Sequence, residues 1–280
     1  MKVGEKMKKS LIISLFIIIA AVLTACGGDE SSSGEEDGLL SDGKLVVGVT
    51  AGPHEQVLEK VIELGEKEGL TIESQVFSDY VMPNVALSEG EIDLNSFQTE
   101  PFFDQMNEER GLDLVKVADT LTFPMGIYSE KLDDIEELSD GAKIGLPSDP
   151  TNSGRALALF EAAGLIKMKE NAGTDATVKD IEENSNNYEF IELDPAQIAR
   201  QLGELDAAAI NSNFAMEHGF VPSEDSIFME GNDSPYANLI AVRNESKDEE
   251  VVQQFIDLYH SDEVKAFVEE EFQGSVLPSW

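Results

Sequence analysis

Short apolar runs alternate with amphipathic stretches from about residue 45 onward. The run from Leu45 to Val49 is typical of a buried strand, and the residues after it place apolar side chains on one side of a helix. Leu70 to Phe77 predicts a second strand and Asp79 to Ser88 a short helix. A third strand is predicted after Asp93, and further strands at 115–118 and 122–128. Repeated strand–helix–strand units predict a mainly parallel α/β sheet.

The pattern restarts after residue 140. Strands are predicted at 143–146, 188–193 and 207–210, and a helix begins near Thr151. Another helix begins at Asp194-Pro195-Ala196-Gln197, which has an acidic N-cap, a proline in the first turn and a glutamine three residues after the cap. The chain then returns through a strand at 239–243 and finishes with two helices.

Two similar turns occur, one in each half of the chain. Leu87 to Asp93 and Leu202 to Asp206 both read as the end of a helix, a turn of glycine, acid, apolar residue and aspartate, and then a strand. Two similar lobes that face one cleft would produce this repeat. Short turns of this kind also arise by chance in α/β proteins.

The first residues predict export. Four lysines precede an uncharged apolar run, Leu11 to Leu23, which is shorter than the roughly 20 residues of a membrane-spanning helix. The run ends in Leu23-Thr24-Ala25-Cys26, which resembles a bacterial lipobox. We therefore expect residues 1–25 to be a lipoprotein signal peptide, Cys26 to carry the lipid, and the Gly-, Ser- and acid-rich residues 26–43 to form a flexible tether.

Composition narrows the classes of function. Cys26 is the one cysteine of the sequence, so a disulfide within the chain and a multi-cysteine metal site are excluded. The formal net charge is −37, which argues against a nucleic-acid partner because phosphate contacts need lysine and arginine. The acidity is explained either by a strongly hydrated surface or by attraction of a cationic ligand.

Three groups of residues could form a binding site beyond the carboxyl ends of strands. Asp149 to Arg155 opens a helix after a strand, where Asn152, free N–H groups and Arg155 suit a carboxylate, although ordinary capping would give the same pattern. Asn211 and Asn238 lie next to strands and could contact both ends of a zwitterion, or simply serve turns. Aromatic residues near strand ends could line an apolar slot, with some of them in the core: Tyr80, Phe97, Phe102, Phe103, Phe123 and Tyr128.

Catalytic signals are weak. His54, His218 and His260 are far apart, and no nucleophile elbow, Walker loop or dinucleotide fingerprint is present. We therefore expect a protein that is not an enzyme and has no cofactor or metal. His54, after Gly52-Pro53, could face the cleft, but we expect it to be solvated at the helix start.

From Lys44 to Trp280 the sequence strongly resembles the methionine-binding lipoproteins of ABC importers, the NLPA lipoprotein family. The stretches that carry the resemblance are Asp79-Tyr80-Val81-Met82-Pro83-Asn84, Asp149-Pro150-Thr151-Asn152 with Gly154-Arg155, Asp233-Ser234-Pro235-Tyr236 with Asn238-Leu239-Ile240, and Trp280.

The resemblance implies a two-lobed, type II periplasmic-binding-protein-like α/β fold with the ligand cleft between the lobes. We expect one lobe to comprise residues 44–124 and 228–280, and the other residues 125–227. The implied partners are methionine, an ABC permease and its ATPase, and the membrane through the lipid anchor, at the extracytoplasmic face of the cell membrane.

The resemblance also implies roles for individual residues. Arg155 would hold the ligand carboxylate, and Asn211 and Asn238 its amino and carboxylate groups. Tyr80, Phe97 and Phe123 would line the side-chain slot.

One position departs from the family pattern. Phe97-Gln98 is followed by Thr99, where family members commonly have a histidine that often touches the ligand, and we expect Thr99 to contact the ligand in its place. Another amino acid or a short methionine-containing peptide is therefore an alternative ligand. A structural or adhesive surface lipoprotein without a transport role is the alternative function.

Overall fold

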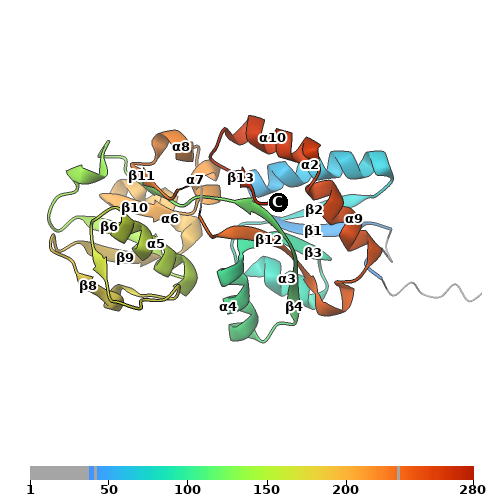
Figure 1. Ribbon diagram of the computed structural model, residues 1–280, viewed down its shortest axis with the longest axis horizontal. Helices are drawn as coiled ribbons and strands as arrows, with labels where there is room; N and C mark the ends of the chain where they lie inside the picture. Colours follow the sequence, from blue (N-terminus) through green and yellow to red (C-terminus); the bar gives the residue numbers. More distant parts are fainter. Residues whose placement is uncertain (1–37, 41–42, 232–233) are drawn as a thin grey trace, which may run out of the picture. The chain divides into compact units, whose positions relative to one another are not determined.

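The computed structural model describes residues 38–40, 43–231 and 234–280. Within these ranges the first of two larger sheets has six strands in the order β13-β4-β12-β3-β1-β2 (Figure 1). β1 pairs in parallel with β2 and β3, whereas β12 pairs antiparallel with β3 and β4. Their bounds are β1 Leu45–Thr50, β2 Ile72–Phe77, β3 Leu94–Thr99, β4 Leu114–Thr122, β12 Ala237–Arg243 and β13 Leu277–Pro278.

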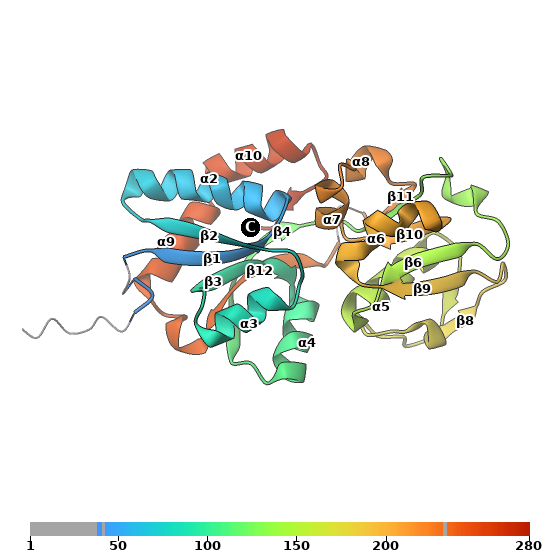
Figure 2. The ribbon, with the colours of Figure 1, turned by 180° about the vertical axis from the view of Figure 1, so that it is seen from behind.

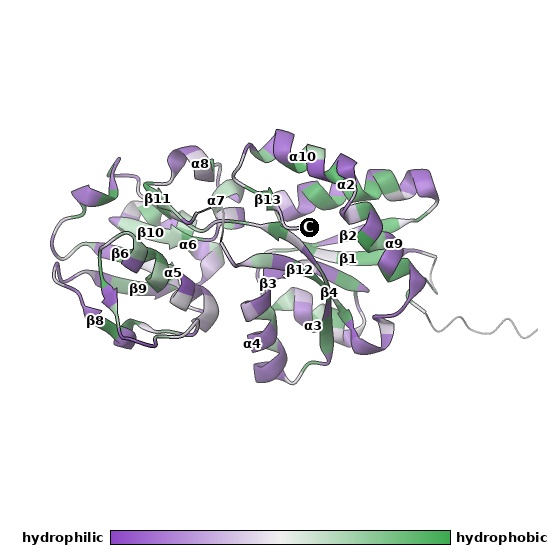
Figure 3. Cartoon of the chain, in the orientation of Figure 1, coloured by the Kyte–Doolittle hydropathy of each residue, from purple (hydrophilic) through white to green (hydrophobic). Residues whose placement is uncertain are grey.

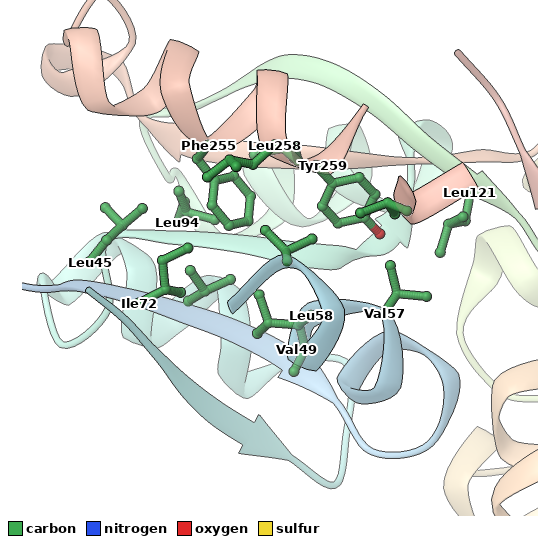
Figure 4. Close-up of a cluster of buried hydrophobic side chains, with 14 of the residues drawn as sticks. Leu45, Val49, Val57, Leu58, Ile72, Leu94, Leu121, Phe255, Leu258 and Tyr259 are labelled. Atoms are coloured by element: carbon green, nitrogen blue, oxygen red, sulfur yellow. The ribbon is translucent and has the colours of Figure 1, made fainter. Parts of the chain in front are cut away.

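Helices cover both faces of this sheet (Figure 2). On one face lie α2 (Pro53–Glu68), α9 (Glu250–Tyr259) and α10 (Asp262–Phe272); on the other lie α3 (Met82–Glu89) and α4 (Glu100–Arg110). Successive side chains of β1 point to opposite faces of the sheet and so pack against both helix layers. Leu45, Val47 and Val49 pack into the hydrophobic cluster under α2, while Val46 packs against the cluster on the opposite face. Figure 4 shows the first cluster, where Phe255 and Tyr259 of α9 face Val57 and Leu58 of α2.

Local signals in the sequence fix the ends of α2. Gly52 precedes the helix with φ of 83°, a backbone conformation that favours glycine, and Pro53 occupies the first turn. Gly69 ends the helix in the left-handed region, and its N–H bonds to carbonyls of the last turn. Helices α2 and α10 carry both hydrophobic and hydrophilic residues along their length, as amphipathic surface helices do (Figure 3).

The second sheet has five strands in the order β11-β5-β10-β6-β9. The two clusters on its faces alternate along β10, where Ala207 and Ala209 pack on one side and Ala208 and Ile210 on the other. The strands are β5 Gly126–Tyr128, β6 Lys143–Pro147, β9 Glu189–Leu193, β10 Ala207–Ile210 and β11 Phe228–Met229, with a separate pair, β7 Lys167–Met168 and β8 Ile181–Glu183.

Four α-helices accompany this second sheet in the part of the chain that is described. They are α5 Pro150–Ala162, α6 Pro195–Gln201, α7 Ser212–Glu217 and α8 Pro222–Asp225. Short 3₁₀ helices complete the described elements of the chain: η1 Ile135–Glu137, η2 Val178–Asp180, η3 Leu202–Glu204 and η4 Asn244–Ser246.

The chain passes between the two sheets twice, once between β4 and β5 and once between β11 and β12. These crossings explain why the first sheet is mixed rather than mainly parallel. Strand β4 leaves the sheet at Thr122 and β12 re-enters it opposite Thr122, so β12 has to run antiparallel to β4. The two-lobed fold expected from the sequence is present.

Two expected elements differ in extent. The strand expected from Thr122 to Tyr128 is broken, because β4 ends at Thr122 and β5 begins at Gly126. The helix expected from Asp79 begins at Met82, since the Asp79 carboxylate accepts hydrogen bonds from the N–H groups of Val81 and Met82 and holds a turn before the helix.

Residues Gly38–Trp280 form one compact unit. No helix among the described residues is long and apolar enough to cross a membrane. The expected signal peptide, the lipid site at Cys26 and most of the expected tether lie outside the described residues.

Candidate functional site

A cavity lies between the two sheets, lined by residues of both. The residues that line it are Tyr80, Phe97, Gln98, Thr99, Phe102, Phe123, Asn152, Arg155, Asn211, Ser212, Asn213 and Asn238. The eight residues expected to contact a ligand all line this cavity: Tyr80, Phe97, Thr99, Phe123, Asn152, Arg155, Asn211 and Asn238. Of the other aromatic candidates, Phe102 also lines it, while Phe103 and Tyr128 lie in hydrophobic clusters of the core.

The first sheet contributes an aromatic wall. Tyr80, in the turn before α3, lies with its ring centre 6.0 Å from that of Phe97 and 5.7 Å from that of Phe102. Phe97 lies on β3, and Phe102 lies in the first turns of α4. Aromatic faces and edges suit an apolar or thioether side chain.

The same wall contacts the second sheet through Tyr80. Its hydroxyl donates to Oδ1 of Asn213 at 2.6 Å, and its ring lies 4.8 Å from that of Phe214. Burial raises the pKa of the Tyr80 hydroxyl, so the group stays a neutral donor. The Nδ2 atom of Asn213 is buried and has no hydrogen-bond partner among the described residues.

A relay of polar side chains begins at the start of α5. Asp149 caps this helix, and its Oδ1 accepts from the backbone N–H of Asn152 at 3.0 Å and from Nδ2 of Asn152 at 2.9 Å. Oδ1 of Asn152 in turn accepts from Nδ2 of Asn211 at 2.8 Å. Burial raises the pKa of the Asp149 carboxyl, which these hydrogen bonds partly offset.

This relay fixes which end of Asn211 faces inward. An ionised carboxylate can only accept, so the amide nitrogen of Asn152 has to face Asp149 and its oxygen has to face Asn211. Oδ1 of Asn211 is consequently left buried without a partner among the described residues. Because an unpaired buried acceptor costs free energy, this atom is suited to accept a hydrogen bond from a ligand.

Arg155 is 4% exposed and lies in the second turn of α5, against the cavity. Its Nε donates to Oε1 of Glu230 at 2.7 Å, its Nη2 donates to Oε2 of Glu230 and to the carbonyl of Phe123, and the ring of Tyr236 lies 4.3 Å from its Cζ. No described residue accepts from Nη1. One edge of the guanidinium is therefore held by the protein, and Nη1 is left for another acceptor.

Sequence reasoning missed Glu230 altogether. Its carboxylate also accepts from the backbone N–H of Met125 and the hydroxyl of Ser234, so it connects the first crossing segment to the second. A lone glutamate among 56 acidic residues carries no signal of its own in the sequence.

The environment of His54 corrects the expectation from the sequence. The side chain is 2% exposed rather than solvated at the helix start, and it lies behind the cavity wall. Its Nδ1 is 2.9 Å from Oγ1 of Thr50, its Nε2 is 2.9 Å from Nδ2 of Asn238, and its ring centre is 4.4 Å from that of Phe123. Burial lowers the pKa of His54 to about 3, so the imidazole is neutral at ordinary pH.

A second buried network supports β3 beneath the cavity. The side chains of Asn84, Asn95 and Gln98 exchange hydrogen bonds of 2.6–3.1 Å. Gln98 also lines the cavity. Because the partners of its amide lie inside this network, Gln98 contributes to the wall mainly as a rigid surface. The described residues contain no group of three or more His, Cys, Asp or Glu that could hold a metal ion.

Two α/β lobes that enclose a cavity lined by carboxamides, one arginine and aromatic rings define a solute-binding protein of the periplasmic type. The profile of the family described as NlpA lipoprotein matches residues 45–280. The chain belongs to the NlpA lipoprotein family.

Known relatives agree with this assignment. The chain is 40% identical over 267 residues to the D-methionine-binding lipoprotein MetQ of Salmonella typhimurium, covering 94% of this chain and 95% of that protein. It is 37% identical over 272 residues to outer membrane lipoprotein 1 of Mannheimia haemolytica, covering 96% and 98%. A nutrient binding protein from Burkholderia cenocepacia, solved bound to methionine, superimposes with a TM-score of 0.82 at 43% identity, covering 84% of this chain and 100% of that one.

Proposed function

We propose that this chain is the solute-binding lipoprotein of an ABC importer, and that it captures methionine and delivers it to the permease. The observation that carries the proposal is a set of polar groups around the cavity that have no hydrogen-bond partner among the described residues: Oδ1 of Asn211, Nδ2 of Asn213 and Nη1 of Arg155. Together they offer both acceptors and donors to one small molecule. The names of the relatives support methionine as that molecule.

The geometry suits the two charged groups of an amino acid. Arg155, with Nη1 available, and Nδ2 of Asn213 are donors for the ligand carboxylate. Oδ1 of Asn211 is an acceptor for the ammonium group. Asn238 and Asn152 complete the polar half of the cavity. Recognition of both ends of a zwitterion explains why carboxamides rather than further charges line the site.

The charge of the site favours a zwitterion over an oxyanion. Glu230 already neutralises Arg155 through a two-point ion pair, so an anion entering the cavity would meet no uncompensated cation. A free amino acid brings no net charge and needs none from the site. Binding of an inorganic oxyanion is thus the less favoured alternative.

The aromatic half of the cavity suits the side chain. Tyr80, Phe97, Phe102 and Phe123 would surround a thioether, whose sulfur makes favourable contacts near ring edges. Thr99 lies at the end of β3 beside these rings and leaves more room than a histidine would. Another apolar amino acid is therefore an alternative ligand.

We further propose that acylated Cys26 anchors the protein at the extracytoplasmic face of the membrane. The permease and its ATPase are the expected partners, and the excess of acidic residues argues against a nucleic acid. We place lobe one at 44–124 and from about 230 to 280, and lobe two between them. The second boundary follows Met229 because β11 pairs with β5 in the second sheet.

The proposal is tested with the full chain purified in detergent. Native mass spectrometry of the fresh protein should detect a retained ligand with the mass of methionine. Calorimetry after removal of that ligand should rank methionine first among the twenty amino acids and a methionine dipeptide. Absence of saturable binding to any of them would reject the proposal and favour a structural or adhesive lipoprotein.

A further inference from the structure

Three side chains are joined by hydrogen bonds at one wall of the cavity, and two of them lie behind it. Thr50 ends β1, His54 lies in the first turn of α2, and Asn238 lies near the start of β12. They are 0%, 2% and 4% exposed. Asn238 lines the cavity, whereas Thr50 and His54 do not. The three residues come from separate elements of the first lobe, so the fold itself brings them together.

The direction of the two hydrogen bonds that join Asn238, His54 and Thr50 follows from the chemistry of these side chains. Nδ2 of Asn238 can only donate, so Nε2 of His54, 2.9 Å away, has to be the acceptor. The imidazole proton is therefore on Nδ1, which donates to Oγ1 of Thr50 at 2.9 Å. A doubly protonated imidazole could not accept from Asn238, and burial keeps the ring neutral. Contact with the ring of Phe123 at 4.4 Å restricts rotation of the imidazole.

We propose that His54 is a positioning residue that turns the carboxamide oxygen of Asn238 toward the ammonium group of the ligand. By accepting from Nδ2, His54 leaves Oδ1 as the end of the carboxamide to which no described side chain donates a hydrogen bond. This inference rests on the proposed capture of an amino acid and adds to it the residue that selects the amino group.

In the opposite lobe, the carboxamide of Asn211 is also oriented by a hydrogen bond to its amide nitrogen. There the relay from Asp149 through Asn152 leaves Oδ1 of Asn211 without a partner. Two carboxamide oxygens, one from each lobe, are thus oriented by hydrogen bonds that neighbouring side chains make to the other end of the carboxamide. An ammonium group has three donors and can use both oxygens, while an analogue without the amino group would leave both unpaired. The site should accordingly reject carboxylic acids that lack an amino group.

The first test reads the tautomer of His54 directly. In the ¹⁵N-labelled full chain, long-range proton–nitrogen correlation should identify His54 as neutral, with the proton on Nδ1, near pH 7. A neutral His54 protonated on Nε2 would overturn the proposal. That tautomer would donate to Asn238 and turn its amide nitrogen toward the ligand. This measurement needs no ligand, so its outcome is independent of whether methionine binds.

The second test changes the tautomer without touching the cavity. Thr50→Val removes the acceptor for Nδ1–H with little change of shape, so the proton should move to Nε2 and the carboxamide of Asn238 should turn over. Affinity for methionine should fall by about tenfold, whereas affinity for 4-(methylthio)butanoate, which lacks the amino group, should change by less than about threefold. Thr120→Val is the matched control, because Thr120 is equally buried on β4 and does not line the cavity.

Two further variants separate positioning from packing. His54→Gln can still offer an acceptor to Asn238 and should keep most of the affinity for methionine, whereas His54→Phe keeps a ring against Phe123 but offers none and should lose it. Equal losses for methionine and its desamino analogue in Thr50→Val would overturn the proposal in favour of a purely structural role. If the unaltered protein binds no methionine, the proposed function fails instead, and the tautomer still reports on His54.

Discussion

Arg155 and Glu230 meet in a buried two-point contact, with Nε and Nη2 of the arginine donating to the two carboxylate oxygens. The side chains are 4% and 13% exposed. Seventy-five positions separate them in the sequence, and they come from the second lobe and from the segment that returns to the first. The residue expected to hold a ligand carboxylate is therefore also part of the connection between the lobes.

Glu230→Ala should destabilise the protein substantially. It leaves a buried guanidinium without its counter-ion, and removal of one partner from a buried pair costs about 3–5 kcal/mol. Urea unfolding followed by circular dichroism measures the change. Glu73→Ala is a suitable control, because Glu73 is 56% exposed in its pair with Lys44 and should change the free energy of unfolding by less than about 1 kcal/mol. Equal effects of the two substitutions would contradict the importance assigned to Glu230.

Arg155→Ala should weaken methionine binding by about 2–5 kcal/mol, because the ligand carboxylate loses its charged donor. The single substitution also leaves Glu230 unpaired, so calorimetry should compare Glu230→Gln with the double variant Arg155→Ala/Glu230→Gln. The further loss in the double variant then reports on the ligand contact. If the two bind methionine equally well, Nη1 does not hold the carboxylate.

Asn211→Leu should reduce methionine affinity by about 1–3 kcal/mol, since an acceptor for the ammonium group is removed and Oδ1 of Asn152 loses its donor. The loss for 4-(methylthio)butanoate should be smaller, because that molecule has no ammonium group. Isothermal calorimetry with both compounds measures the difference. A loss of the same size for both would assign Asn211 to shape rather than to the amino group.

His54 should make the protein less stable in mild acid. Its pKa is lowered from 6.5 to about 3, so between these values the unfolded chain takes up a proton that the folded chain does not. The contribution of His54 to the free energy of unfolding is therefore fully present above about pH 6.5 and is lost as the pH falls toward 3. Between pH 7 and pH 5 the loss should be about 2 kcal/mol.

Urea titrations of the unaltered protein and of His54→Gln at both pH values isolate this effect, because the other titrating groups are common to the two. The variant should lose less stability than the unaltered protein on going to pH 5. Identical losses would mean that His54 is accessible to protons in the folded state.

Local sequence patterns predicted most of the helices and strands, but not which residues at their ends contact one another. The capping of α5 by Asp149 and the strand periodicity of Leu45 to Val49 are local features, and both are present. The two-lobed fold and the roles of individual residues followed from the resemblance to a family, whereas Arg155, Asn211 and Asn238 were candidates already from their places beside strands and a helix start. His54 and Glu230 could not be predicted, because their partners Asn238 and Arg155 lie 184 and 75 positions away. Antiparallel insertion of β12 likewise depends on where the chain re-enters the sheet.

The hydrogen bonds of Arg155 reach both strands of chain that join the halves of the molecule, through the carbonyl of Phe123 and the carboxylate of Glu230. A ligand that accepts a hydrogen bond from Nη1 of Arg155 would therefore be connected to both of these segments at once. Ligand binding and the angle between the lobes would then be coupled through the same side chain. A permease that binds only one of these angles would therefore distinguish the loaded protein from the empty one.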